Sequence, residues 1–336
     1  MEYKNSNEKD RNVFLDISNL KVEYVTREET VYAVNGVDIR LEKGKVLGLV
    51  GETGAGKTTI ARSILGVLQS PPGVIREGSI SLNGRNLLEL PEEEMEKIRG
   101  KSITMIFQDP MTALNPVMTV GAQISEVIRL HNKLSDAEVR KRAEEMLETV
   151  GIPAERYDEF PHQFSGGMKQ RVVIAIALAC EPELLLADEP TTALDVTIQA
   201  QVLELMQELN RKHNTTTILI THDLGVVAEM CDVVSVIYAG QVVESGTLED
   251  IFRHPTHPYT IGLFGALPKL DEDVEWLSPI DGLPPDPTDL PKGCKFGPRC
   301  KYCTEECRMA EVGLTEVSEG HQVRCIHCGG SDTGEA

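Results

Sequence analysis

Short runs of apolar and mostly β-branched residues recur along the chain and alternate with stretches of helical periodicity. The clearest runs are VLGLV (46–50), ITMIF (103–107), LLLA (184–187), TILI (217–220) and VVSVI (233–237). This alternation predicts an α/β domain. Several of these runs contain no polar alternation, so we expect their strands to be buried on both faces.

From residue 117 the alternation gives way to helices only. Ser135 and Glu138 have the spacing of a capping box ahead of RKRAEEMLETV, and Gly151 stands at the C-cap position of that helix. We therefore expect an inserted helical subdomain over about 117–180, within a core domain that spans 13–267.

The C-terminal part of the chain differs in composition from the rest. Residues 268–291 are rich in proline and aspartate, which predicts an extended linker. A cysteine-rich tail follows at 292–328, and we expect flexible ends at 1–12 and 329–336.

Charge and hydropathy narrow the choice of partners and compartment. The chain has 33 Lys and Arg against 53 Asp and Glu, a net charge of −20, which argues against nucleic acid as a partner. The longest apolar stretch, Val172 to Cys180, is too short to cross a bilayer, and MEYKNSNEKDRN at the start lacks the apolar core of a secretory signal. We therefore expect the eight cysteines to be free thiols or metal ligands in a reducing cytosol.

A glycine-rich segment lies between the run VLGLV and the helical pattern TTIARSILGVL, which is the context of a P-loop. Its glycines allow backbone N–H groups to converge on phosphates, Lys57 reaches the β- and γ-phosphates, and the Thr58 hydroxyl can bind Mg²⁺. The alternative is a glycine-rich surface turn. The predicted nucleotide-binding residues are Gly51, Glu52, Thr53, Gly54, Ala55, Gly56, Lys57, Thr58 and Thr59.

The apolar run LLLA is followed directly by Asp188 and Glu189. A buried run ends in paired acids when these face a cation or a polar reaction site, so Asp188 can belong to the Mg²⁺ shell and Glu189 can orient an attacking water. The alternative is a pair of solvated acids at a strand end.

Five further strings complete a set of motifs: Tyr24, Gln108 in IFQDP, FSGGMKQR (164–171), Asp195 in ALD and His222 in ITHD. With the P-loop and the paired acids, they resemble the motifs of ABC-type ATPases in that family's order. The resemblance implies an ABC-type P-loop ATPase core with a helical subdomain and a small Cys-rich C-terminal extension, using ATP and Mg²⁺.

The same resemblance assigns roles to single residues. Tyr24 stacks on adenine, Glu189 polarises water, His222 contacts the γ-phosphate, and Gln108 senses Mg²⁺ and water. Lys57 stabilises the charge that develops on the phosphates.

The signature string places a helix N-terminus at Ser165, Gly166 and Gly167, which suits an anion. By resemblance, this end faces ATP on a second subunit, and Asp195 is a further nucleotide-binding residue. Hydrolysis would then depend on closure of a dimer.

Other strings resemble the dipeptide/oligopeptide importer branch of the family. They are Met168 in the signature, Phe107 to Pro116 at the Q-loop, and HPYT at His257 to Thr260. The resemblance implies a subunit on the cytoplasmic face of the membrane that works with two transmembrane permease subunits, a paralogous ATPase and, indirectly, an extracellular substrate-binding protein. A homodimer is expected for the isolated chain.

Other functions stay open at the level of sequence. Close relatives of this type carry nickel or oligosaccharides in place of peptides, and the chain is alternatively a soluble ABC ATPase or a nucleotide-gated regulator without turnover. His254 and His257 are either metal ligands or turn and packing residues, and the lack of a carboxylate or thiol close in sequence favours packing.

Six of the eight cysteines lie in the tail. The spacing of Cys294, Cys300, Cys307 and Cys325 resembles that of the importer family, in which four thiolates hold a [4Fe–4S] cluster. Two Cys-x2-Cys pairs, completed by Cys303 and Cys328, also suit Zn²⁺, and unligated thiols or disulfides are a third alternative. Cys180 and Cys231 are predicted to be small buried hydrophobic residues.

Overall fold

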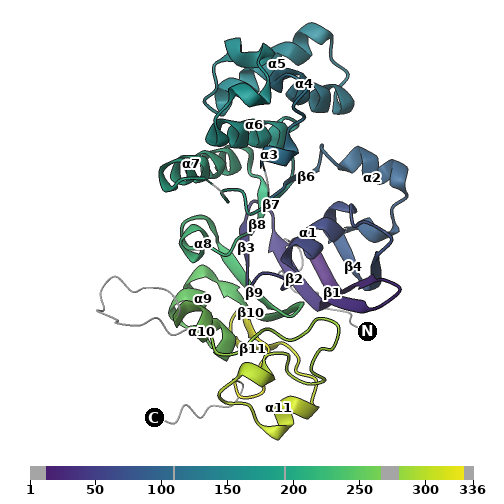
Figure 1. Ribbon diagram of the computed structural model, residues 1–336, viewed down its shortest axis with the longest axis vertical. Coiled ribbons are helices and arrows are strands. Elements are labelled where there is room, and N and C mark those ends of the chain that lie inside the picture. The colour runs from purple at the N-terminus through teal and green to yellow at the C-terminus, as the bar shows by residue number, and fades with distance from the viewer. Residues whose placement is uncertain (1–12, 109, 193, 266–279, 329–336) are drawn as a thin grey trace, which may run out of the picture. The chain divides into compact units, whose positions relative to one another are not determined.

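The structure, a computed structural model, describes residues 13–108, 110–192, 194–265 and 280–328 (Figure 1). Two compact units are present: unit 1 comprises Met1–Phe14, Leu41–Val46 and Asn86–Thr221, and unit 2 comprises Leu15–Arg40, Leu47–Arg85 and His222–Ala336. The ends at 1–12 and 329–336 and residues 268–279 of the expected linker lie outside the described residues.

Unit 1 contains three adjacent parallel strands, β6 (Ile103–Ile106), β7 (Leu184–Asp188) and β8 (Thr216–Ile220), with β7 between the other two. Every residue of these strands is buried, as the unbroken apolar runs predict. Outside the predicted helical subdomain, the helices of unit 1 are η2 (Leu87–Glu89), α2 (Glu92–Ile98), α3 (Pro110–Ala113) and α7 (Val196–His213).

The predicted helical subdomain belongs to unit 1, where α4, α5 and α6 lie together (Figure 1). Ser135 and Glu138 form the expected capping box at the start of α5, and Gly151 follows its C-cap with φ +74°. The elements are α4 (Val120–His131), α5 (Asp136–Thr149), η3 (Ala154–Asp158), η4 (Pro161–Gln163) and α6 (Gly166–Leu178).

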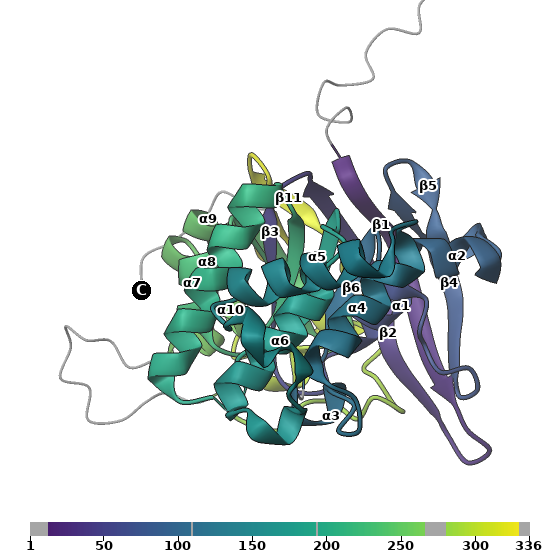
Figure 2. The same ribbon diagram turned by 90° about the horizontal axis from the view of Figure 1, so that it is seen from above.

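Unit 2 contains most of a four-stranded sheet in the order β2-β1-β4-β5, in which β1 and β4 run antiparallel (Figure 2). The strands are β1 (Val13–Val25), β2 (Thr30–Glu42), β4 (Gly73–Leu82) and β5 (Arg85–Asn86). An irregularity between Ser18 and Val22 shifts the register of β1 against β4. The sequence patterns did not predict this sheet.

Unit 2 also contains the strand order β11-β12-β10-β9-β3. Here β3 (Val46–Val50) runs parallel to β9 (Val233–Tyr238), and β10 (Gln241–Thr247) returns antiparallel to β9. The tail adds β12 (His321–Val323) to β10 and β11 (Thr315–Ser318) to β12.

The helices of unit 2 are α1 (Lys57–Leu65), α8 (Leu224–Met230), α9 (Leu248–Arg253), α10 (Pro258–Gly265), η5 (Gly297–Arg299) and α11 (Glu305–Met309). Within the described ranges, no helix combines the length and the apolar character that crossing a bilayer requires.

Candidate nucleotide site

The P-loop of unit 2 connects β3 to α1 and needs glycine at two positions. Gly51 and Gly56 have φ of +155° and +101°. A Cβ atom would lie 2.1 Å from the Ile237 carbonyl oxygen at Gly51, and 2.3 Å from the Ala33 carbonyl oxygen at Gly56. Only glycine therefore allows the loop to pack this closely against its neighbours.

Lys57 is the first residue of α1, and its side chain folds back over the loop. The ammonium donates hydrogen bonds to the carbonyl oxygens of Gly51 (2.7 Å) and Glu52 (2.9 Å). No acidic residue occupies the first turn of α1. The loop thus combines a helix N-terminus with a fixed ammonium group, which fits the phosphates of a nucleotide.

Two other predicted residues belong to the same unit. The Tyr24 hydroxyl on β1 lies 3.1 Å from the Thr59 hydroxyl oxygen on α1, so the structure brings Tyr24 next to the P-loop helix. His222 is exposed and directly precedes Asp223, whose carboxylate caps α8 by accepting from the amides of Gly225 and Val226.

The carboxylate half of the predicted site lies in unit 1. Asp188 is buried at the end of β7, and Glu189 follows with a left-handed backbone (φ +49°), which is strained for a residue other than glycine. The amide of Glu189 donates to the Ile220 carbonyl (2.8 Å). Its Oε2 atom accepts from Gln108 Nε2 and from Thr192 Oγ1, both at 2.9 Å. The carboxylate therefore has a fixed orientation.

Thr192 was not predicted as a site residue. Its only signal in the sequence is its place three residues after Glu189 in DEPTT, where the hydroxyl can reach back to the carboxylate.

The signature string forms the start of α6. Ser165 is its N-cap and accepts from the Met168 amide (3.4 Å), and both Ser165 and Gly166 are exposed. The buried Gln170 side chain donates to the Pro190 carbonyl, so α6 is joined to the segment that follows β7. Asp195, also exposed, caps α7 by accepting from Ile198 N (3.0 Å).

Phe164 and Met168 of the signature string both contact one arginine. The Arg156 guanidinium carbon lies 4.1 Å from the centre of the Phe164 ring, and Arg156 Nη1 lies 3.3 Å from the Met168 sulfur. Glu159 pairs with the same guanidinium at 2.6 Å. These two side chains therefore have a packing role at the start of α6.

The expected [4Fe–4S] cluster, with Zn²⁺ as its alternative, is wrong for the described part of the chain, where no group of three or more Cys, His, Asp or Glu side chains is arranged to hold a metal ion. The eight cysteines are free thiols, and several of them hydrogen-bond to protein groups. The Cys307 sulfur lies 3.2 Å from His327 Nε2 and 3.3 Å from Thr304 Oγ1. The ligands expected for the cluster were Cys294, Cys300, Cys307 and Cys325.

The thiols differ in how readily they lose a proton. Burial raises the pKa of Cys294 and of Cys300, which favours the neutral thiol at these two positions. A hydrogen bond from Cys328 lowers the pKa of Cys325 to about 6, while the same bond raises the pKa of Cys328.

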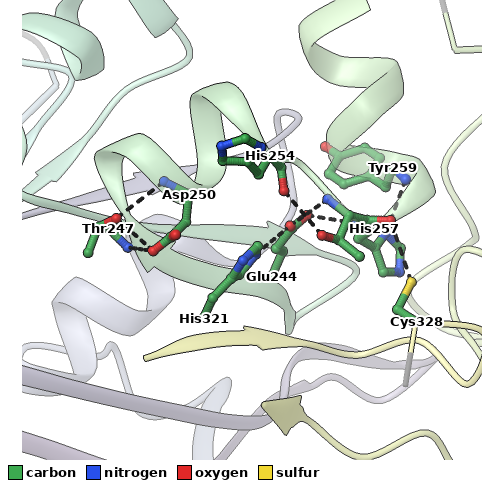
Figure 3. Close-up of polar contacts among 9 residues, drawn as sticks. Glu244, Thr247, Asp250, His254, His257, Tyr259, His321 and Cys328 are labelled. Carbon is green, nitrogen blue, oxygen red and sulfur yellow. Dashed lines mark hydrogen bonds and ion pairs between the residues drawn. The ribbon is translucent and has the colours of Figure 1, made fainter. Parts of the chain in front are cut away.

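A buried carboxylate, Glu244, connects the tail to β10 (Figure 3). Glu244 on β10 is fully buried and lies 2.8 Å from His321 Nε2 on β12. It also accepts from the backbone amides of Thr256 (2.7 Å) and His257 (2.9 Å). His257 is itself buried, and its Nδ1 accepts from the Tyr259 amide (3.0 Å), which is a packing role.

Two family descriptions match the chain: ABC transporter over residues 34–192, and oligopeptide/dipeptide transporter, C-terminal region, over residues 243–307. The chain is 50% identical to the oligopeptide transport ATP-binding protein AppD of Bacillus subtilis, over 93% of this chain and 96% of that protein. It is 51% identical to the dipeptide transport ATP-binding protein DppD of the same organism, over 93% of each chain. The chain belongs to the oligopeptide/dipeptide family of ABC transporter ATP-binding proteins.

Solved structures agree with the fold of an ABC transporter ATP-binding protein. A dimeric ATP-binding cassette, MJ0796, solved in a post-hydrolysis state with ADP and Pi, matches with a TM-score of 0.63 and 29% identity over 70% of this chain and 98% of that chain. The cassette cbiO1 of Clostridium perfringens matches with a TM-score of 0.62 and 28% identity, over 73% and 92%. The predicted ABC-type P-loop ATPase fold, and the ATPase activity that this family couples to import, are confirmed.

Proposed function

We propose that this chain binds ATP and Mg²⁺ at the cytoplasmic face of a membrane and hydrolyses the ATP to drive import of short peptides. The observation that carries the proposal is the orientation of the Glu189 carboxylate by Gln108 and Thr192, because a strained and doubly hydrogen-bonded acid is suited to orienting a water. The names of the relatives point to peptides as the cargo.

The roles of the remaining side chains follow from phosphoryl transfer to water. Lys57 and the P-loop amides neutralise charge on the β- and γ-phosphates, Tyr24 stacks on the adenine, and His222 contacts the γ-phosphate. Glu189 orients the water and accepts its proton. Most of these side chains position the reacting groups or neutralise charge on the phosphates.

Magnesium fits the oxygen donors that the chain offers. The Thr58 hydroxyl and the Gln108 side chain would bind the ion directly, and the buried Asp188 carboxylate would bind it through water. When bound, Mg²⁺ supplies positive charge that stabilises the phosphates.

We further propose that Ser165, Gly166, Gly167 and Asp195 act on nucleotide bound to a second ATPase subunit. Ser165, Gly166 and Asp195 are exposed at the N-termini of α6 and α7, and the relative MJ0796 was solved as a dimer. The second subunit is a paralogous ATPase, and two permease subunits complete the transporter with an external substrate-binding protein. Residues 292–328 are, in this proposal, a cysteine-rich extension with a structural role.

Lys57→Ala tests the phosphate site directly. Removing the ammonium should weaken binding of a fluorescent ATP analogue to the full-length chain by about tenfold or more, because a charge-assisted contact to the phosphates is lost. Unchanged affinity would contradict the site.

Co-purification tests the transport role. Expressed with its genomic neighbours, the tagged chain should recover two membrane subunits, and ATP hydrolysis by that assembly should rise with a peptide-loaded binding protein. A stable soluble complex with nucleic acid, or stimulation by nickel or oligosaccharide alone, would contradict peptide import.

A further inference from the structure

Arg299 in the C-terminal region forms a salt bridge with Glu52, the second residue of the P-loop. The Arg299 guanidinium donates Nη1 to Glu52 Oε2 (2.9 Å) and Nη2 to Glu52 Oε1 (3.1 Å), a bidentate pair that spans 247 positions of sequence. The Arg299 side chain is only 5% exposed and that of Glu52 is 28% exposed. The Glu52 side chain, expected from its motif to belong to the nucleotide cradle, is thus directed toward the tail.

Arg299 is itself held rigidly. It donates to the carbonyl oxygens of Asp281 (3.0 Å) and Ile280 (3.2 Å) and to the Tyr238 hydroxyl (3.3 Å). Burial opposes its charge, but the hydrogen bonds to Glu52 and Tyr238 raise the pKa of Arg299, so the guanidinium stays charged. The planar fork therefore presents two fixed donors to one carboxylate.

Tyr259, in the HPYT string, holds the main chain of the same P-loop residue. The Glu52 amide donates to the Tyr259 hydroxyl oxygen (3.0 Å), and the Tyr259 side chain is fully buried. The carbonyl of Glu52 in turn accepts from Lys57 Nζ (2.9 Å). Side chain, amide and carbonyl of Glu52 are thus all fixed, the first two by residues outside the P-loop.

The supports of Arg299 and Tyr259 pack on each other. The ring centres of Tyr238 and Tyr259 are 4.6 Å apart, and both rings contact Phe296 in the tail, at 5.3 and 5.5 Å. The segment that precedes the tail is bonded to β2, because the Pro287 carbonyl accepts from the Tyr32 amide (2.8 Å). Pro284, Pro285, Pro287 and Leu290 line one cavity of about 140 Å³ together with the P-loop residues Glu52–Ala55.

We propose that Arg299 and Tyr259 are positioning residues for ATP, which hold the P-loop main chain at Glu52 in the conformation that receives the phosphates. The inference rests on the proposed function of the P-loop and adds to it a tail that takes part in nucleotide binding. Neither residue touches ATP; both act through Glu52.

The test compares binding of a fluorescent ATP analogue, with Mg²⁺, to full-length variants. Arg299→Ala should raise the Kd about tenfold, and Tyr259→Phe about threefold, because a displaced loop receives the phosphates less well. Arg299→Lys should recover only part of the loss, since an ammonium cannot donate to both carboxylate oxygens in the same way. In a double-mutant cycle, Glu52→Ala with Arg299→Ala should bind no more weakly than either single variant.

Arg308→Ala is the matched control, because Arg308 is an exposed arginine of the same tail. Its Kd should equal that of the wild type. Circular dichroism identifies variants that fail to fold, and if Arg299→Ala is among them, Tyr259→Phe and Glu52→Gln carry the test.

Two results would overturn the inference: a Kd within twofold of the wild type for folded Arg299→Ala or Tyr259→Phe, or additive losses in the cycle. The Lys57→Ala variant distinguishes a failure of this inference from a failure of the proposed ATP site. If Lys57→Ala binds ATP weakly while Arg299→Ala binds it normally, only the proposed role of Arg299 and the tail is rejected. If Lys57→Ala binds ATP normally, the proposed phosphate site is rejected.

Discussion

Glu189 shows at the scale of one residue how backbone strain and hydrogen bonding serve a reaction. Its backbone is left-handed directly after β7, and two donors fix one carboxylate oxygen. Glu189→Gln should keep ATP binding, trap the closed dimer and lower turnover at least about 100-fold, because the amide is a far weaker proton acceptor. Phosphate release from the assembled transporter is the measurement.

Thr192→Val is the companion variant, since it removes one donor and leaves the carboxylate. It should lower turnover only several-fold. Turnover within fivefold of the wild type for Glu189→Gln would show that the attacking water is oriented by another group.

At the scale of elements, the buried pair of Glu244 and His321 adds to the backbone pairing of β10 with β12. His321→Ala would leave the fully buried Glu244 with backbone donors alone. The free energy of unfolding should fall by about 2 kcal/mol, because removing the partner of a buried hydrogen-bonding group typically costs about 1–3 kcal/mol. Urea denaturation measures the change.

Arg253→Ala gives the comparison for that measurement, because its pair with Glu249 at 3.7 Å joins two side chains that are more than 70% exposed. Its effect should stay below about 0.5 kcal/mol. Equal effects of the two substitutions would contradict a stabilising role for the buried pair.

The elements also show what sequence patterns reveal. The runs at 46–50, 184–187 and 217–220 predict strands correctly because burial on both faces removes polar residues. The strands β1 and β4 mix buried, half-buried and exposed positions, so no such run marks them.

The candidate site also contains features that the sequence predicts and features that it does not. Motif order predicts Lys57, Gln108 and Glu189, whose local strings carry a signal. It misses the pairing of Glu52 with Arg299, because nothing local links residues 247 positions apart. Cysteine spacing led to the wrong metal prediction, since spacing along the chain does not reveal how the side chains are arranged in space.

At the scale of the whole molecule, one buried histidine makes stability depend on pH. Burial lowers the pKa of His257 from 6.5 to about 4. Between these values the unfolded chain takes up a proton that the folded chain does not, so stability should fall as the pH falls from about 6.5 to about 4. The loss reaches about 3 kcal/mol at the acid end.

His257→Gln removes this titration while an amide oxygen can still accept from the Tyr259 backbone. Unfolding by urea, followed from pH 7 to pH 4.5, should show a steeper loss for the wild type than for the variant. Parallel curves would mean that His257 is protonated in the folded chain.

The pairing of β12 with β10 has a consequence for solubility. Without the tail, Gln241–Thr247 would present a row of unsatisfied amides and carbonyls, a template on which the same strand of another molecule can dock. With the tail in place, the edge strand is β11 (Thr315–Ser318), whose four residues are mostly exposed and polar. This short edge strand is a poor template for pairing with another molecule. A chain cut at residue 291 should accordingly self-associate as its concentration rises, even where its P-loop is intact.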